Sequence, residues 1–348
     1  MSPYILTTLL LTLGLGTTIT FASTHWLLAW MGLELNTLAI LPLMAQHHHP
    51  RAVEATTKYF LVQATAAATI LFAGISNAWF TGQWEIQQMS HPLPCTLLIL
   101  ALALKIGLAP LHTWLPEVLQ GLNLNTGLIL STWQKLAPFS IIVQLNTPYS
   151  PTLIILGITS TLIGGWGGIN QTQLRKILAY SSIAHLGWMI LVLQFSPTLT
   201  LLALFTYIAM TSSLFLLFNF IKATNINTLA TTWSKAPVLT AFTPLVLFSL
   251  GGLPPLTGFL PKWMILQELT KQDLTPIATI AALSALLSLY FYLRLSYAMT
   301  LTTSPNTTPS TLSWRLPSHS LILPMSLMTT MSICLLPISP ATLSLLAP

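Results

Sequence analysis

Five ionisable side chains stand out because each lies in the middle of a long apolar stretch. They are Glu34, Lys105, Lys135, His185 and Lys262. Each is about ten residues from an end of its stretch, which at a helical rise of about 1.5 Å per residue is roughly half of a 30 Å membrane core. The spacing therefore predicts five protonatable groups at one depth, on different membrane helices.

Charged groups at this depth are costly, at about 2.5–3.5 kcal/mol each. The stem of a lysine is too short to reach the membrane surface from the centre. These groups must therefore face a hydrated interior or one another, and we predict a row that carries protons sideways. Movement of Glu34 relative to Lys105 would switch that lysine between its charged and neutral forms. The alternative is a fixed Glu34–Lys105 salt bridge, with Lys135 and Lys262 bound to backbone carbonyls.

Two histidines are candidate supports of such a path. His112 follows a helix break and could connect Lys105 with water, or could orient itself by a hydrogen bond to the backbone. His185 could relay protons or could be a packed, hydrogen-bonded ring. The triplet 47–49, three histidines, has no acidic or thiol neighbour, so we expect an interfacial loop and no metal site.

The composition indicates what kind of protein holds these groups. Only 5% of the 348 residues are charged, 53% are hydrophobic, and the mean hydropathy is +0.75. A soluble domain carries about 25% charged residues, and disordered chains are poor in apolar ones. Both classes are excluded, and an all-α polytopic membrane protein remains. Two cysteines, Cys95 and Cys334, are too few for an iron–sulfur cluster. The net charge of +6 comes from scattered single residues, which argues against nucleic acid binding.

The apolar runs predict about eleven transmembrane helices. Their approximate bounds are 3–21, 25–45, 57–80, 93–120, 125–145, 150–170, 175–195, 198–221, 237–271, 275–300 and 321–342. The fourth and ninth are too long for one straight crossing and carry glycine and proline in the middle. We expect both to be broken helices.

The two broken spans are five apart, so they should cross the membrane in opposite directions. This pattern is typical of two inverted five-helix repeats, an arrangement found where ions or substrates cross at mid-membrane. Similar sequences support it, since Leu108-Ala109-Pro110-Leu111 and Leu253-Pro254-Pro255-Leu256 are each followed by a second proline. The expected division of this single membrane domain is 1–146 (first repeat), 147–301 (second repeat) and 302–348 (a loop and a final helix).

The basic residues of the connections predict the orientation. One side collects Arg51, Lys58, Arg175, Lys176, Lys222, Lys235 and Arg315, and the other has only Lys271. The N-terminus falls on the basic, electrically negative side, and eleven crossings place the C-terminus opposite.

Two motifs carry a family resemblance. The run 173–187, QLRKILAYSSIAHLG, and the run 251–259, GGLPPLTGF, with Lys262 nearby, resemble the antiporter-like subunits of respiratory complex I, the proton-pumping NADH–quinone oxidoreductase. The opening helices, with His25-Trp26 and the run 32–36, GLELN, resemble the animal mitochondrial, eleven-helix form of this family. The resemblance covers essentially the whole chain.

The resemblance implies a membrane-arm subunit that translocates protons across the mitochondrial inner membrane, driven by NADH oxidation and ubiquinone reduction in other subunits. It implies that Glu34 and Lys105 form a coupling pair, that Lys135 is the central lysine and that Lys262 leads to the exit, with His112 and His185 supporting the water path. It also implies a matrix N-terminus and a C-terminus in the intermembrane space. FMN, iron–sulfur clusters and quinone would belong to other subunits, with no cofactor in this chain. Expected neighbours are antiporter-like subunit 4, subunit 4L and membrane lipids, cardiolipin among them.

Two other functions compete with this one. A stand-alone secondary cation/proton antiporter shares the logic of inverted repeats. A purely structural scaffold is the third hypothesis, and it predicts that Lys135 and Lys262 can be replaced without changing proton transport.

Overall fold

The computed structural model of the chain describes residues 2–45, 49–89, 91–145, 151–234, 237–301 and 322–346. Its regular elements are helices throughout this part, with two isolated bridges, His25–Glu85 and Gln173–Asn225. The prediction of an all-helical membrane protein is confirmed. The chain divides into two compact units, Met1–Leu156 and Gly157–Pro348.

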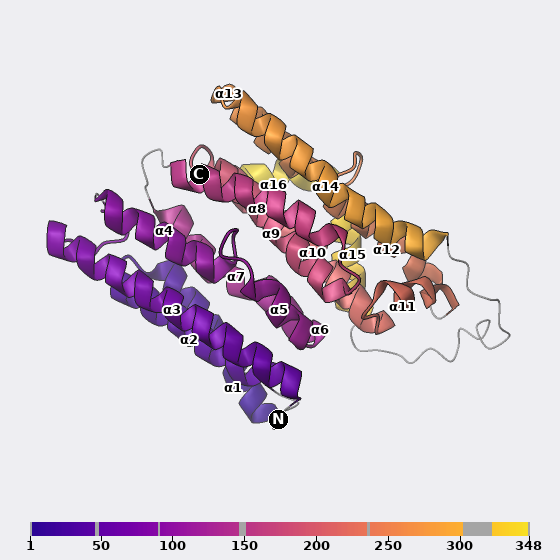
Figure 1. Cartoon of the computed structure of the whole chain (residues 1–348), viewed down its shortest axis with the longest axis horizontal. Coiled ribbons are helices and arrows are strands. Elements are labelled where there is room, and N and C mark those ends of the chain that lie inside the picture. The colour runs from indigo at the N-terminus through magenta and orange to yellow at the C-terminus, as the bar shows by residue number, and fades with distance from the viewer. Residues whose placement is uncertain are drawn as a thin grey trace. The chain divides into compact units, whose positions relative to one another are not determined.

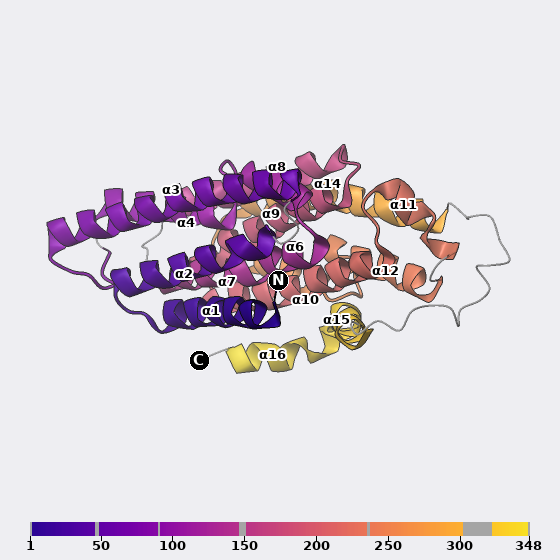
Figure 2. The same cartoon turned by 90° about the horizontal axis from the view of Figure 1, so that it is seen from below.

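The first unit contains seven helices in its described residues, and an eighth crosses the division. They are α1 Pro3–Ala22, α2 Trp26–Met44, α3 Pro50–Thr81, α4 Pro92–Ile106, α5 Trp114–Gly121, α6 Leu124–Ser131, α7 Trp133–Gln144 and, at the division, α8 Pro151–Ile169. Helix α1 packs on α2, α2 on α3, and α3 on α4 and α5 (Figures 1 and 2). Helices α1 and α2 approach closely because Gly16 faces Gly32. A Cβ atom on Gly16 would lie 2.9 Å from the Gly32 carbonyl oxygen.

The second unit is arranged around α9, the most buried of its apolar helices. Its elements are α9 Leu174–Leu193, α10 Pro197–Ile221, α11 Ile226–Ala230, the short 3₁₀ helix η1 Thr232–Ser234, α12 Pro237–Gly251, α13 Phe259–Lys271, α14 Thr275–Thr300, α15 Ile322–Cys334, the 3₁₀ helix η4 Leu336–Ile338 and α16 Ser339–Leu346. Helices α10, α13 and α14 each contact α9, and α15 packs on α10 and α12. The described part of the chain contains seven helices long and apolar enough to cross a membrane, or eight if the bent α15–α16 pair is one span. The count of eleven therefore stays a prediction, and so does the inverted repeat. Lys235 and Arg315 lie outside the described residues.

Both long spans are broken where the sequence predicts. Gly107 directly follows the end of α4 and Gly252 directly follows the end of α12, and their φ angles of 86° and 79° favour glycine. In each break the glycine and the leucine after it donate their N–H groups to one carbonyl of the last helical turn, that of Ala103 or of Phe248. After each break the backbone passes through prolines into a second, shorter helix, α5 after the first break and α13 after the second.

A third break was not predicted from the sequence. The expected span 125–145 is divided into α6 and α7 at Thr132, whose φ and ψ are −110° and −66°. The hydroxyl of Thr132 donates to the Leu128 carbonyl at 2.7 Å, a local side-chain bond that bends helices. The break precedes Lys135 by less than one turn.

Candidate functional site

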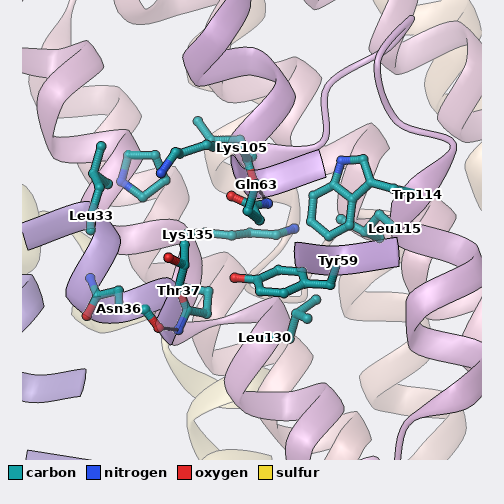
Figure 3. A pocket seen from close by; sticks show the side chains of 14 residues that line it. Leu33, Asn36, Thr37, Tyr59, Gln63, Lys105, Trp114, Leu115, Leu130 and Lys135 are labelled. Atoms are coloured by element: carbon teal, nitrogen blue, oxygen red, sulfur yellow. Dashed lines mark hydrogen bonds between the residues drawn. The ribbon is translucent and has the colours of Figure 1, made fainter. Parts of the chain in front are cut away.

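A small polar cavity in the first unit brings two of the candidate lysines together. Its volume is about 20 Å³, and Lys105 from α4 and Lys135 from α7 both line it. Figure 3 shows the Lys135 side chain extended across the cavity between Gln63 and Tyr59, with Trp114 at one end. A cavity of about 10–15 Å³ is enough for one water molecule, provided that polar partners surround it. This cavity, which both lysines line, therefore has room for one water.

Both lysines are almost completely shielded from solvent. Lys105 is 6% exposed and Lys135 is 3% exposed. Lys105 lies in the last turn of α4, immediately before the break at Gly107. Its Nζ is buried, and within the described residues it has no hydrogen-bond partner. A buried ammonium without a partner is costly, so this atom calls for a water or a rearrangement.

Glu34 lies beside this cavity, on α2. Its Oε2 accepts a hydrogen bond of 3.0 Å from the Thr37 hydroxyl, and Thr37 lines the cavity. Glu34 interacts electrostatically with Lys105. Within the described residues, Glu34 and Lys105 do not form an ion pair with a nitrogen–oxygen distance of 4.0 Å or less. The structure thus places the two charges near each other without the direct salt bridge of the alternative interpretation.

Helix α3 supplies cavity residues that the sequence analysis missed. Tyr59 and Gln63 are four residues apart, so they lie on one face of α3, and both are buried. The Gln63 amide Nε2 donates to the Lys105 carbonyl at 3.3 Å. The Tyr59 ring packs against Trp114, whose indole N–H donates to the Leu104 carbonyl at 3.1 Å. Two large polar side chains at this spacing in an apolar helix are a signal that could have identified them.

The turn after the first break holds His112, beside α5. Its Nδ1 donates to the Pro110 carbonyl at 3.2 Å, which is the orienting backbone bond of the second interpretation. Glu117 of α5 lies further along and accepts from Lys58 of α3 at 2.8 Å, and Glu54 pairs with the same lysine at 2.7 Å. These three side chains are exposed, so the ion pairs between α3 and α5 contribute little to the stability of the fold.

Lys262 lies in the second unit, one turn into α13. Its Nζ reaches back across the break and donates to the carbonyls of Gly251 at 2.9 Å and Leu250 at 3.3 Å. These carbonyls are at the end of α12, where a helix lacks internal donors and carries partial negative charge. The carbonyl binding that the alternative interpretation expects is therefore present at Lys262. These hydrogen bonds fix the position of the Lys262 ammonium. The role of Lys262 in proton transfer stays a prediction.

His185 lies within α9 and packs on a tyrosine. Its ring centroid is 5.8 Å from that of Tyr207 on α10, and the rings are inclined at 44°. The Tyr207 hydroxyl shares hydrogen bonds with the side chains of Ser182 and Thr211. The histidine thus adjoins a buried hydroxyl cluster, which fits both the packed ring and the relay that the sequence allows.

Side chains that could bind a metal ion do not gather in the part of the chain that the structure describes. No group of three His, Cys, Asp or Glu residues occurs there that could hold a metal ion. Cys95 is buried in the first unit and Cys334 is exposed in the second.

The chain matches two protein-family models. Residues 23–288 match the membrane domain described as NADH:quinone oxidoreductase/Mrp antiporter, and residues 289–343 match the NADH dehydrogenase subunit 2 C-terminus. Among solved structures, a chain of respiratory complex I from Thermus thermophilus is similar with a TM-score of 0.81 and 27% identity, over 94% of this chain and 78% of that one. A chain of the Mrp complex from Dietzia sp. shares the fold, with a TM-score of 0.84 at 17% identity over 97% of this chain and 76% of that one. The fold and the buried lysines thus define an antiporter-like membrane subunit.

Curated relatives narrow this class. NADH-ubiquinone oxidoreductase chain 2 of Tetraodon nigroviridis is 72% identical over 99% of both chains, and that of Oncorhynchus mykiss is 66% identical over the full length of both. The chain belongs to the NADH-ubiquinone oxidoreductase chain 2 family of complex I membrane subunits. Its partners are therefore other subunits of complex I. The relatives are animal proteins, which is consistent with the mitochondrial inner membrane.

Proposed function

We propose that this chain carries protons through complex I along Glu34, Lys105, Lys135 and Lys262. The observation that carries the proposal is the small cavity that Lys105 and Lys135 both line, which has room for one water. A water there would accept a hydrogen bond from one ammonium and donate to the neighbouring amine once that amine is neutral. A proton would then pass between the two lysines without either side chain leaving its helix.

Glu34 is proposed to control the first step. A carboxylate close to Lys105 stabilises its ammonium form, and a carboxylate further away leaves that charge uncompensated in a buried site. The hydrogen bond from Thr37 holds the Glu34 carboxylate in its present position. A shift of α2 or of the α4 break would change the separation and release the Lys105 proton toward the cavity.

His112, His185 and Lys262 are proposed to extend the path. His112 would connect Lys105 with water at the first break. His185 with the Tyr207 hydroxyl would receive protons in the second unit, and Lys262 would pass them to the exit. The Gly251 and Leu250 carbonyls accept hydrogen bonds from the Lys262 amine, so departure of its proton would weaken this contact at the second break.

We expect Tyr59→Phe to impair proton transfer at the cavity, because it removes one hydroxyl and little volume. General acid–base groups contribute about 10²–10⁴-fold in rate, so a supporting group that only binds the water should give about a threefold to tenfold loss. The measurement is the proton-to-electron ratio of the intact complex in proteoliposomes. The control is Tyr290→Phe on α14, where the tyrosine is 56% exposed.

A high-resolution map of the intact complex gives an independent reading of the same site. Density for a water bonded to Lys105 or Lys135 is expected in the native protein and should be absent after Gln63→Leu. A dry cavity in the native protein, with the Tyr59→Phe ratio unchanged, would contradict the proposed path.

The finer placement in the complex is also part of the proposal. The N-terminus would face the matrix and the C-terminus the intermembrane space, because the basic connections gather on the N-terminal side. Antiporter-like subunit 4 and subunit 4L would be the lateral neighbours, with lipids such as cardiolipin around them. FMN, the iron–sulfur clusters and the quinone site would lie in other subunits, which would supply the redox energy.

The stand-alone antiporter remains the clearest contrasting function. Relatives at 65–72% identity along almost the whole chain carry the name of a complex I chain, which favours the complex I role. Purification separates the two: the chain should co-purify with complex I and should not exchange sodium for protons by itself in liposomes. Sodium–proton exchange by the isolated chain would overturn the pump proposal.

A further inference from the structure

A cluster of hydroxyl groups lies in the interior of the second unit, next to His185. Tyr207 of α10 packs on the His185 ring and hydrogen-bonds the side chains of Ser182 and Thr211. Tyr292 of α14 interacts electrostatically with Tyr207. These four hydroxyl-bearing residues are each 1% exposed. Helices α9, α10 and α14 therefore bring polar side chains together where the surrounding residues are apolar.

The Tyr292 hydroxyl lacks a hydrogen bond. Its oxygen is buried, and within the described residues it has no hydrogen-bond partner. The Ser181 side chain interacts with it without reaching the geometry of a hydrogen bond. A buried tyrosine hydroxyl normally finds a partner, because leaving it unpaired costs free energy. This group therefore calls for a water.

The serine and threonine hydroxyls of the cluster have already used their hydrogens. Ser181 donates to the Leu178 carbonyl at 2.8 Å, and Ser182 donates to the Ala179 carbonyl at 2.7 Å. Thr211 likewise donates to a carbonyl of its own helix, at 2.8 Å. A hydroxyl group has one hydrogen, so the oxygens of these residues act as acceptors within the cluster. Acceptors there outnumber donors, which favours the entry of water or of a group that brings a proton.

The ring of Tyr292 also reaches the second helix break. A Cβ atom on Gly251 would lie 3.8 Å from Tyr292 Cδ2, so this ring edge packs on the end of α12. The Gly251 carbonyl accepts the 2.9 Å hydrogen bond from Lys262 Nζ. Helix α14 contacts both α12 and α9. A single side chain thus extends from the residue that binds Lys262 to the hydroxyl cluster beside His185.

We propose that Tyr292 relays protons between the hydroxyl cluster at His185 and Lys262. The inference rests on the proposed proton path and adds to it a residue of α14. The step begins with a protonated His185 and a neutral Lys262. His185 gives up its proton by way of the Tyr207 hydroxyl, and the Tyr292 oxygen receives a proton as its own hydroxyl proton passes through a water to the Lys262 amine. His185 ends neutral, Lys262 ends as an ammonium, and both tyrosines are regenerated.

Tyr292→Phe tests the relay in the intact complex. The substitution removes one hydroxyl and keeps the ring that packs on Gly251, so the complex should assemble normally on a native gel. Proton transfer through this chain should fall about tenfold, at the low end of what a positioned proton-transfer group loses, because water can replace part of the relay. The measurement is the proton-to-electron ratio in proteoliposomes. Tyr297→Phe is the matched control, since that tyrosine is on the same helix and is 55% exposed.

The solvent isotope effect separates a relay from a structural role. Loss of the relay makes proton transfer slower than the other steps, so deuterated water should slow pumping more in Tyr292→Phe than in the native complex. Ser181→Ala removes an acceptor beside Tyr292 and should give the same change with a smaller loss, about threefold. If Tyr292→Phe does not assemble, Ser181→Ala carries the test. Reduced pumping with an unchanged isotope effect would mean that Tyr292 only supports packing, and it would overturn the relay.

Lys262→Met, measured in parallel, distinguishes this inference from the proposed function. If Lys262→Met lowers the proton-to-electron ratio and Tyr292→Phe does not, the relay is overturned and the path through Lys262 stands. If both variants pump normally, the path itself fails in the second unit and the relay fails with it. Both variants lowering the ratio, with the isotope effect raised in Tyr292→Phe and the Tyr297 control unchanged, is the result that the relay predicts.

Discussion

Replacing Lys135 by Met should lower the number of protons pumped per electron, with the complex assembled and its electron-transfer cofactors intact. Methionine fills nearly the same volume but has no exchangeable proton, so the cavity between α4 and α7 loses one of its two amines. Proton transfer through this chain should fall at least tenfold, in line with the 10²–10⁴-fold that positioned acids and bases contribute. The measurement is the proton-to-electron ratio in proteoliposomes, with NADH oxidation by an artificial acceptor as the check on redox activity.

The conservative variant Lys135→Arg separates charge from titration. Arginine keeps the positive charge but does not release its proton at physiological pH, so it should fail almost as completely as methionine. If electrostatic support of neighbouring helices were the only role, arginine would restore pumping. An unchanged ratio in both variants would favour the structural scaffold among the three hypotheses.

The sequence is sufficient to locate the charged residues within the apolar spans and the breaks in the two longest spans. Charged residues in lipid are so costly that Lys105 and Lys135 could be identified without a structure, and the structure places both at one cavity. Gly107 and Gly252 were recognisable because glycine and proline together interrupt an apolar run. Both glycines indeed end their helices with positive φ.

The remaining features depend on three-dimensional packing. Tyr59 and Gln63 become cavity residues only because α3 packs on α4. Their spacing indicates a polar face on α3, but it does not specify which helix that face meets. At the Thr132 break, the threonine hydroxyl donates to a carbonyl of its own helix. Threonines in membrane helices commonly make this bond without breaking the helix, so the residue alone does not predict the break. The contact of Lys262 with the end of α12 requires the exact path of the intervening turn. Sequence pattern predicts depth and sidedness, whereas these contacts are set by how the helices pack.

The sharpest structural prediction concerns Gly258, at the start of α13. A Cβ atom at this position would collide with the backbone carbonyl of Ser249, and Met210 Sδ would lie only 3.1 Å away. Backbone atoms of a packed helix cannot move aside as a flexible side chain can, so Gly258→Ala should force α13 away from α12. Overpacking typically costs about 1–3 kcal/mol, and a collision with backbone belongs at the upper end.

Lys262 makes this change a functional test as well. It lies one turn after Gly258 and reaches the carbonyls of Gly251 and Leu250 only while α13 is folded back on α12. Gly258→Ala should therefore lower the amount of assembled complex several-fold, and the complex that does assemble should pump fewer protons per electron. Native gel electrophoresis and the proton-to-electron ratio measure the two effects.

Two other glycines calibrate the result. Gly14→Ala in α1 adds a methyl group where no atom lies within 4 Å, so assembly should be normal. Gly252→Ala meets only the Lys262 side chain, at 2.9 Å from Cδ, but carries the backbone penalty of a positive φ, about 1–2 kcal/mol. The expected order of damage is Gly258, then Gly252, then Gly14. Normal assembly of the Gly258 variant would mean that the second break does not close as tightly as the structure indicates, and the carbonyl site of Lys262 would then lose its support.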